Sequence, residues 1–183
     1  MTQFNDMQSV KRQFFAYRNG IIADTMRKAG SPFKIIFGLN IPQIKQIASE
    51  IGKNKALAAK LWNNNTTRES MLLAPMIYPA DELDIAEAFE LSAATCTPEI
   101  ADGLCHNLLK KTAFVENIIE ELKDSERDMD RYIALRLSWT LLPERIDFVE
   151  SLAKAESTRD SRLTRGVVRQ ILDEIEWIKS ASC

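Results

Sequence analysis

The sequence contains few of the residues that form tight turns. Only six glycines and six prolines occur among 183 residues, which is too few for the many turns of a β-sandwich or a β-barrel. No segment approaches the roughly 18 consecutive apolar residues of a membrane span. Asn5, Asp6 and Gln8 lie where a secretory signal would be hydrophobic. We therefore expect a helical, cytoplasmic protein that does not enter a membrane.

Residues for metal and redox chemistry are scarce as well. The three cysteines, Cys96, Cys105 and Cys183, match no zinc or redox spacing, so we expect reduced thiols. His106 is the single histidine, which excludes a metal site built from several histidines. The chain also lacks a glycine-rich phosphate loop, a nucleophile elbow and an HExxH motif. The sequence therefore predicts neither a bound metal nor a cofactor.

Basic residues are not in excess. Lys and Arg number 24 against 26 Asp and Glu, and the formal net charge is −2. A chain with this balance has no overall positive field that would attract nucleic acid. Any surface that binds an anion must therefore be a local patch.

Apolar residues recur at helical spacing over nearly the whole chain. The series from Val10 to Met26 predicts one long first helix that ends at Gly30, and Pro42 begins a second helix that ends near Ile51. The later segments form helix pairs that repeat about every 30 residues. These pairs are 55–63 with 67–77, 81–94 with 98–111, 114–123 with 129–142, and 145–156 with 159–178.

The spacing of these pairs predicts the fold. Short polar connections make neighbouring helices antiparallel, and a pair that cannot bury its own apolar face must stack on the next one. We expect an all-α fold, a right-handed α-α superhelix (solenoid) of HEAT-like antiparallel helix pairs. No linker is visible, so residues 1–183 are expected to form a single domain. The apolar helix around Tyr132–Trp139 is expected to be central, and Trp62 and Trp139 to be core residues.

Polar residues near the starts of the second helices are the candidates for function. In a curved solenoid the second helices line the concave face, so these side chains are expected to converge in one groove. They are Arg68, Asp102, Arg131 and the series Arg162, Arg165 and Arg169.

The arginine series has the spacing of a phosphate-binding helix face. Arg162, Arg165 and Arg169 lie at positions i, i+3 and i+7, while the apolar residues from Leu163 to Ile175 take the opposite face. Each guanidinium matches two phosphate oxygens. Lys110 and Lys111 extend this set. The alternative is a solvated face with ion pairs to Asp160, Asp173 or Glu174.

Asp102 is the candidate acid. A carboxylate in a groove stabilises the oxocarbenium-like sugar that forms when a glycosidic bond breaks. A base that already carries a positive charge leaves without protonation, so one acid is sufficient. The alternative is an early helical Asp that stabilises the helix dipole and pairs with Arg131 or with His106, four residues later. We interpret His106 as a structural partner of Asp102.

Four stretches of the chain resemble the DNA alkylation repair family, the HEAT-like alkylpurine DNA glycosylases. They are Phe37–Pro42 with the following helix, Leu61–Trp62 with Arg68–Glu69, Ala101–Leu104, and Asp130–Leu135. The resemblance implies a C-shaped solenoid whose basic concave face binds double-stranded DNA. It also implies hydrolytic release of cationic 3- or 7-alkylpurines without a metal and without full base flipping. In that activity Asp102 would stabilise the oxocarbenium ion and Arg131 would hold the DNA backbone.

Two positions depart from the family pattern. The aromatic residues that contact the lesion in the family correspond to Pro98 and about Arg169 in this chain. Three functions therefore stay open at this point: an alkylpurine DNA N-glycosylase (a hydrolase), a non-catalytic binder of bent or branched DNA, and a scaffold for a protein partner. We expect a monomer in each case.

Overall fold

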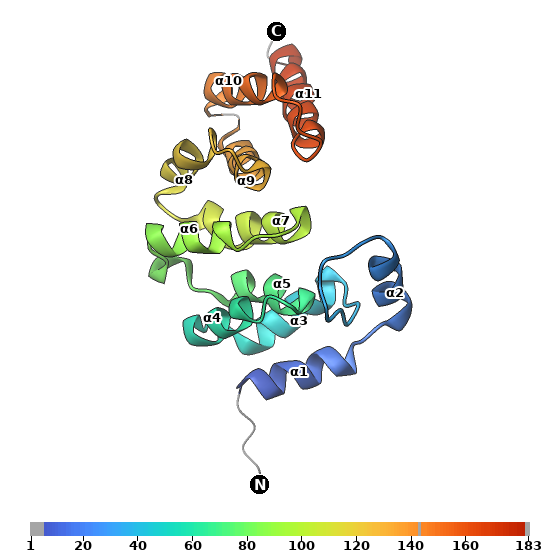
Figure 1. The fold of residues 1–183 in the computed structure, drawn as a ribbon. Coiled ribbons are helices and arrows are strands. Elements are labelled where there is room, and N and C mark those ends of the chain that lie inside the picture. Colours follow the sequence, from blue (N-terminus) through green and yellow to red (C-terminus); the bar gives the residue numbers. More distant parts are fainter. Residues whose placement is uncertain (1–5, 143, 182–183) are drawn as a thin grey trace. The chain divides into compact units, whose positions relative to one another are not determined.

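Helices make up the regular structure of the computed structural model (Figure 1), which describes residues 6–142 and 144–181. Within these residues there are eleven α-helices, three 3₁₀ turns and no β-strand. The chain divides between Leu83 and Asp84 into two compact units. No helix of the described residues is long and apolar enough to cross a lipid bilayer. Cys183 lies outside the described residues; Cys96 is exposed and Cys105 is buried.

The first unit is built around the pair α4 and α5. Helix α5 also packs against α3, and α1 packs against α4. The core of this unit contains Phe14, Ile44, Leu61 and Met71, all of which are fully buried. Its helices are α1 (Asp6–Ala16), α2 (Gly20–Lys28), α3 (Ile41–Ile51), α4 (Lys55–Asn63) and α5 (Arg68–Ile77), followed by the 3₁₀ turn η1 (Ala80–Glu82).

The prediction of one long first helix is wrong, because the chain breaks between α1 and α2. Asn19 adopts an extended conformation, and its side chain accepts the N–H groups of Ile21 and Ile22. This is the geometry of an N-cap, which begins a new helix. Gly20 follows at the first helical position. The apolar series continues across the break, so periodicity alone did not reveal it.

A buried carboxylate holds the segment between α2 and α3 against α5. Glu69 is fully buried and accepts the backbone N–H groups of Phe37 at 3.1 Å and Gly38 at 2.9 Å. The guanidinium of Arg68 lies 3.0 Å from the same carboxylate and also donates to the carbonyl of Leu39. Burial of both charges is tolerated because each is paired and hydrogen-bonded. These bonds fix the position of the residues just before α3.

The second unit is a stack of helix pairs around α9. Helix α9 packs against α6, α7, α8, α10 and α11, which confirms the prediction that this apolar segment is central. In Figure 1, α7, α9 and α11 lie on one side of this unit and α6, α8 and α10 on the other. The elements are α6 (Ile85–Ala93), α7 (Pro98–Asn107), η2 (Leu109–Lys111), α8 (Val115–Leu122), α9 (Asp128–Ser138), η3 (Trp139–Leu141), α10 (Ile146–Ser157) and α11 (Arg165–Ala181).

Helix α11 begins later than predicted. Residues 161–164 form a turn in which the Ser161 hydroxyl donates to Asp128 at 2.8 Å and accepts the N–H of Thr164. Arg162 lies in this turn, ahead of the first helical residue, Arg165. The prediction that three arginines share one helix face is therefore wrong, and only Arg165 and Arg169 do. Val167, Ile171 and Ile175 occupy the buried face as predicted.

Long cationic side chains close two helix ends in place of glycine. The Lys53 ammonium donates at 3.0 Å to the carbonyls of both Met76 and Tyr78, at the end of α5. The Arg127 guanidinium, at the start of α9, donates to the carbonyls of Ser92, Ala93 and Thr95. The last carbonyls of a helix have no partner within the helix. Here they are satisfied by side chains from a neighbouring element.

Gly38 is the position where the first unit tolerates no side chain. Its φ is +79°, and a Cβ there would lie 2.2 Å from the carbonyl oxygen of Asn19. We expect Gly38→Ala to destabilise the protein by more than the roughly 1–3 kcal/mol of backbone strain alone, because the N-terminus of α2 must move. Urea unfolding measures this loss.

Gly52 supplies the matched control. Its φ is +73°, but a Cβ there would meet nothing within 4 Å, so Gly52→Ala carries only the strain. Equal losses of unfolding free energy in the two variants would show that the close approach of Gly38 to α2 is unimportant.

Candidate functional site

A hollow between α7 and α9 contains the predicted acid. Asp102 lies on α7, which packs against α9, and Tyr132 and Arg136 follow one another by one turn on α9. The hollow has a volume of about 340 Å³, and the residues that line it all belong to the second unit. They are Asp102, Cys105, His106, Lys110, Arg136, Trp139 and Thr140.

Asp102 is half-exposed and is held by one of its two oxygens. Its side chain is 42% exposed, and its Oδ1 lies 2.7 Å from Arg136 Nε. The same Oδ1 accepts the hydroxyl of Tyr132 at 3.1 Å. No hydrogen bond to Oδ2 is found among the described residues. The carboxylate is thus oriented by α9 while one oxygen keeps its acceptor capacity.

The helix pattern explains this position. Ala101, Leu104 and Cys105 face the core of the second unit and are buried. Asp102 follows the first of them, so it lies at the edge of the buried face of α7. From that edge its carboxylate reaches α9 on one side and solvent on the other.

Arg136 is itself fixed by an aromatic ring. Its guanidinium carbon lies 5.5 Å from the centre of the Trp139 ring, within the range of a cation–π contact. The prediction that Trp139 is a core residue is wrong, because it is partly exposed and lines the hollow. With Arg136 and Lys110 against the single carboxylate of Asp102, cations outnumber anions in this lining.

Two further groups near Asp102 stay protonated at neutral pH. Burial, together with the nearby charge of Asp102, raises the pKa of Tyr132 to about 12, so its hydroxyl remains a hydrogen-bond donor. Burial also raises the pKa of the Cys105 thiol. A thiol in such surroundings is a poor nucleophile. Asp102 is therefore the anionic group of this hollow.

His106 and Lys110 lie beside each other at the rim. The Nδ1 of His106 is 3.1 Å from the Lys110 ammonium, and both side chains are exposed enough to meet solvent. Lys111 is exposed in the same 3₁₀ turn. Asp102, His106 and Lys110, three of the predicted residues, thus lie together around one hollow.

Arg131 is buried and faces away from this hollow. Its Nε donates to Glu156 at 3.2 and 3.0 Å, its Nη1 donates to the carbonyl of Ser125, and its Nη2 contacts Asp128. Both side chains of the Arg131–Glu156 pair are less than a tenth exposed. A DNA phosphate would reach this guanidinium only if these bonds broke.

The same network reaches the turn before α11. Glu156 accepts the Thr164 hydroxyl at 2.6 Å. Asp128 accepts the Ser161 hydroxyl, and this bond, with that from Arg131, lowers the pKa of the Asp128 carboxyl. Arg131 therefore links α9, α10 and the residues that begin α11.

The remaining predicted cations are placed in different ways. Arg165 and Arg169 are 70% and 84% exposed and form surface ion pairs with Asp160 and Asp173, at 2.9 and 3.7 Å; their binding of phosphate stays a prediction. Arg162 is exposed in the turn. Arg68 belongs to the first unit and is buried beside Glu69.

The sequence pattern did not reveal the partners of Asp102. Tyr132 and Arg136 are four residues apart, a spacing that places them on one helix face, and this was the available signal. Their position opposite Asp102 depends on the packing of α9 against α7, which no local pattern encodes. No group of three or more metal-ligating side chains occurs in residues 6–142 and 144–181.

Comparison with known proteins defines first the fold and then the family. A solved structure, of a new family of proteins related to the HEAT-like repeat DNA glycosylases with affinity for branched DNA structures, superposes with a TM-score of 0.80. The two chains are 14% identical, and the match covers 92% of this chain and 74% of that one. The fold is thus an all-helical HEAT-like repeat, as predicted.

The family follows from the sequence match. The model of the DNA alkylation repair enzyme family matches residues 10–171, so this chain belongs to that family. Comparison with curated proteins gives no match.

The buried position of Arg131 leads to a test of its role. We expect Arg131→Ala to lower the free energy of unfolding by about 3–5 kcal/mol, because Glu156 is left buried without its cation. The exposed Arg165 gives the control, since Arg165→Ala removes an equal charge at little cost. Thermal or urea unfolding measures both. Similar small losses would contradict a structural role for Arg131.

Proposed function

We propose that this chain binds double-stranded DNA through its second unit and hydrolyses the N-glycosidic bond of cationic alkylated purines at Asp102. The observation that carries this proposal is the half-exposed Asp102 carboxylate, held through Oδ1 by Tyr132 and Arg136. Membership of the DNA alkylation repair enzyme family supports DNA as the ligand.

The proposed reaction requires one negative charge near the sugar. The bond between C1′ and the base nitrogen breaks, and its electron pair neutralises the cationic base. The sugar then carries positive charge, which the Asp102 carboxylate stabilises. Water adds to C1′ and releases a proton, so the products are the free alkylated base and an abasic sugar. A leaving base that is already cationic needs no general acid.

Tyr132 and Arg136 act as positioning residues in this scheme. They restrict the rotation of the Asp102 side chain, so that the orientation of the carboxylate is set before DNA binds. The ion pair with Arg136 also offsets part of the negative charge. This offset lowers the stabilisation that Asp102 gives to the positively charged sugar, so we expect hydrolysis to be slow.

DNA phosphates would be held by exposed cations on the same side of the second unit. Lys110 and Lys111 lie in the 3₁₀ turn after α7, and Lys110 lines the hollow that contains Asp102. Arg165 and Arg169 lie on α11, which is on the same side as α7 in Figure 1. Arg162 precedes α11. Surface ion pairs such as that of Arg165 with Asp160 are weak, so a phosphate can replace the carboxylate.

The role of Asp102 is tested by Asp102→Asn. We expect this variant to release 7-methylguanine and 3-methyladenine from methylated duplex DNA at least about 100-fold more slowly, because the charge that stabilises the sugar cation is lost. Its DNA affinity should be equal or higher. Release is measured by chromatography of the free bases.

Glu99→Gln is the matched control for this experiment. Glu99 is exposed one turn earlier on α7, so the substitution removes the same charge from the same helix. It should leave base release unchanged. Intact lesions after long incubation with the pure wild-type protein would reject the enzyme.

A second candidate function is non-catalytic binding of branched DNA. The Arg136–Asp102 ion pair favours it, because a partly neutralised carboxylate is a weaker catalyst, and so do Pro98 and Arg169 at the positions of the family's aromatic lesion contacts. The solved structure with the same fold comes from proteins with affinity for branched DNA. Binding to a four-way junction without base release would favour this candidate.

Both candidates require phosphate contacts that respond to salt. We expect the double variant Arg165→Ala/Arg169→Ala to bind DNA more weakly and to reduce the slope of log Kd against log salt by about 2, one unit for each lost contact. Fluorescence anisotropy over a salt series measures the slope.

The control variant lies on the other side of the same unit. Arg145 and Lys154, at the start and end of α10, are also exposed and ion-paired. Arg145→Ala/Lys154→Ala should not change the slope. An equal change in both double variants would mean that DNA binds without preference for the α7–α9–α11 side.

A further inference from the structure

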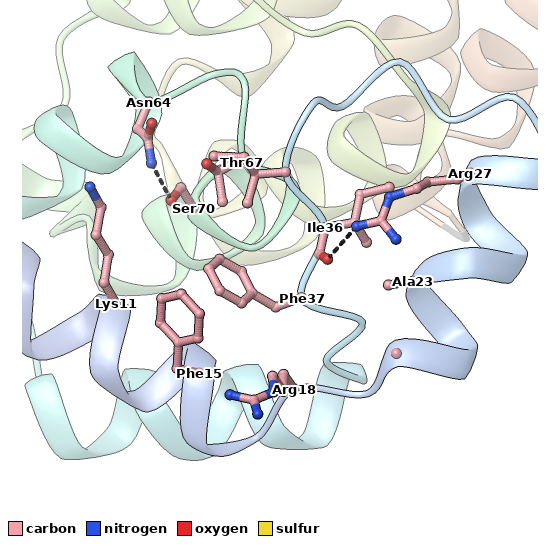
Figure 2. Close-up of a pocket in the computed structure, with 12 residues that line it drawn as sticks. Lys11, Phe15, Arg18, Ala23, Arg27, Ile36, Phe37, Asn64, Thr67 and Ser70 are labelled. Atoms are coloured by element: carbon pink, nitrogen blue, oxygen red, sulfur yellow. Dashed lines mark hydrogen bonds between the residues drawn. The ribbon is translucent and has the colours of Figure 1, made fainter.

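The first unit contains a larger hollow that the proposed reaction does not use. Its volume is about 520 Å³, within the range of pockets that bind small ligands. Figure 2 shows the side chains that line it, which come from α1, α2 and the residues between them, the segment before α3, the end of α4 and the start of α5. We call it the α1–α2 hollow.

Exposed aromatic and apolar side chains form one wall of the α1–α2 hollow. Phe15 is 55% and Ile35 46% exposed. The Phe15 ring meets Phe37 edge to face, with ring centres 5.0 Å apart, and Phe37 is held in turn by Phe14 at 5.5 Å. Exposed apolar residues that gather around a hollow, in contrast to isolated ones, mark binding sites. Phe15 thus presents a supported ring to the ligand.

The charged residues of this lining all have the same sign. Lys11, Arg18 and Arg27 line the hollow, and none of the Asp and Glu residues in the described part of the chain does. Arg27 is held by Asp24 at 2.7 Å and donates to the carbonyl of Ile36. Lys11 and Arg18 are exposed, and no ion pair of either is found within residues 6–142 and 144–181. The ligand that complements this lining is an anion.

Hydrogen-bonding groups occupy another part of the lining, as the labelled Asn64 and Ser70 show in Figure 2. The Asn64 amide donates to the Ser70 hydroxyl at 2.9 Å, a bond that does not use the Asn64 carbonyl oxygen. An alkyl chain in the hollow would leave this oxygen without a partner, at a cost in free energy. A flat ring with a hydrogen-bonding edge would satisfy it.

We propose that the α1–α2 hollow binds one unpaired nucleotide of a single-stranded DNA segment. The base stacks on Phe15, as bases do on aromatic side chains in single-strand binding sites. Its edge meets the Asn64 carbonyl oxygen, and the phosphates that flank it pair with Lys11 and Arg18. A single-stranded end or a base at a branch point would present such a nucleotide. This site stands on the first unit alone and is separate from the chemistry at Asp102.

The test uses the full chain and a labelled, 5′-phosphorylated oligothymidylate of about four nucleotides, which contains no duplex. We expect Phe15→Ala to weaken binding by about 5- to 100-fold through the loss of stacking. Lys11→Ala/Arg18→Ala should weaken binding and also lower its salt dependence. An oligonucleotide of the same length that carries abasic sugars has no base to stack. Its affinity for the wild type should be as low as the affinity of the oligothymidylate for Phe15→Ala.

Two variants outside the hollow serve as controls. Ile21 is 81% exposed on the neighbouring α2, so Ile21→Ala removes an exposed apolar side chain, and Lys28→Ala removes a charge from the same helix. Neither should change the affinity. Because Phe15, Lys11 and Arg18 are exposed, all of these variants should remain folded, as circular dichroism can verify.

Several results would overturn the site. They are no binding of the oligothymidylate, equal binding of the abasic strand, or an affinity that Phe15→Ala leaves unchanged. Displacement of the bound oligothymidylate by an acidic peptide at lower concentration than by thymidylate would assign the hollow to a protein partner instead. Base release from duplex DNA by Phe15→Ala is measured in parallel, so that failure of this site and failure of the Asp102 reaction are distinguished.

Discussion

The second unit depends on a buried ion pair between Arg131 and Glu156. Removing two charges from water costs several kcal/mol for each ion, and the cost is offset only when both are paired and hydrogen-bonded. Here Glu156 also accepts the Thr164 hydroxyl, and Arg131 also binds Asp128 and the Ser125 carbonyl. The pair therefore fixes one rotation of α9 relative to α10 and α11. Any other rotation would bury an unpaired charge.

That rotation decides what the other face of α9 presents. With Arg131 directed at α10, Tyr132 and Arg136 reach Asp102 on α7. The geometry around Asp102 is thus a consequence of a contact on the opposite face of the same helix. Arg131, which stabilises the fold, and Arg136, which holds Asp102, are five positions apart on α9, and their side chains therefore leave the helix in different directions.

Local patterns predicted the helices well where helix ends carry their own signals. The expected 55–63 helix matches α4 to the residue, because Asn54 supplies the N-cap and polar residues follow. The break at Asn19–Gly20 carried a similar signal, but the apolar series continued across it. The later start of α11 depends on the Ser161–Asp128 bond, which joins residues 33 positions apart, and no window of sequence contains both.

The candidate site was predictable only in part, for the same reason. Asp102, His106 and Lys110 follow one another on α7 and in the turn after it, so helical spacing brings them together. Arg131 has the residue type of a phosphate ligand, but its burial depends on Glu156, in another helix. Arg136 and Trp139 belong to the hollow because α9 packs against α7. Spacing along one helix therefore predicted which of its residues share the site. It could not predict which residues of another helix join them, because that depends on how the helices pack.

The cationic helix caps have a consequence for how the repeats fold. Glycine would let each helix end by itself, through its own backbone. Arg127 instead closes α6 from a distance of 32 to 35 residues along the chain, so the end of α6 is completed only when α9 is in place. In a stack of this kind neighbouring repeats stabilise one another. Because a distant arginine and not a glycine completes the end of α6, this helix end depends on another repeat. We therefore expect the helices of this unit to fold cooperatively and not one pair at a time.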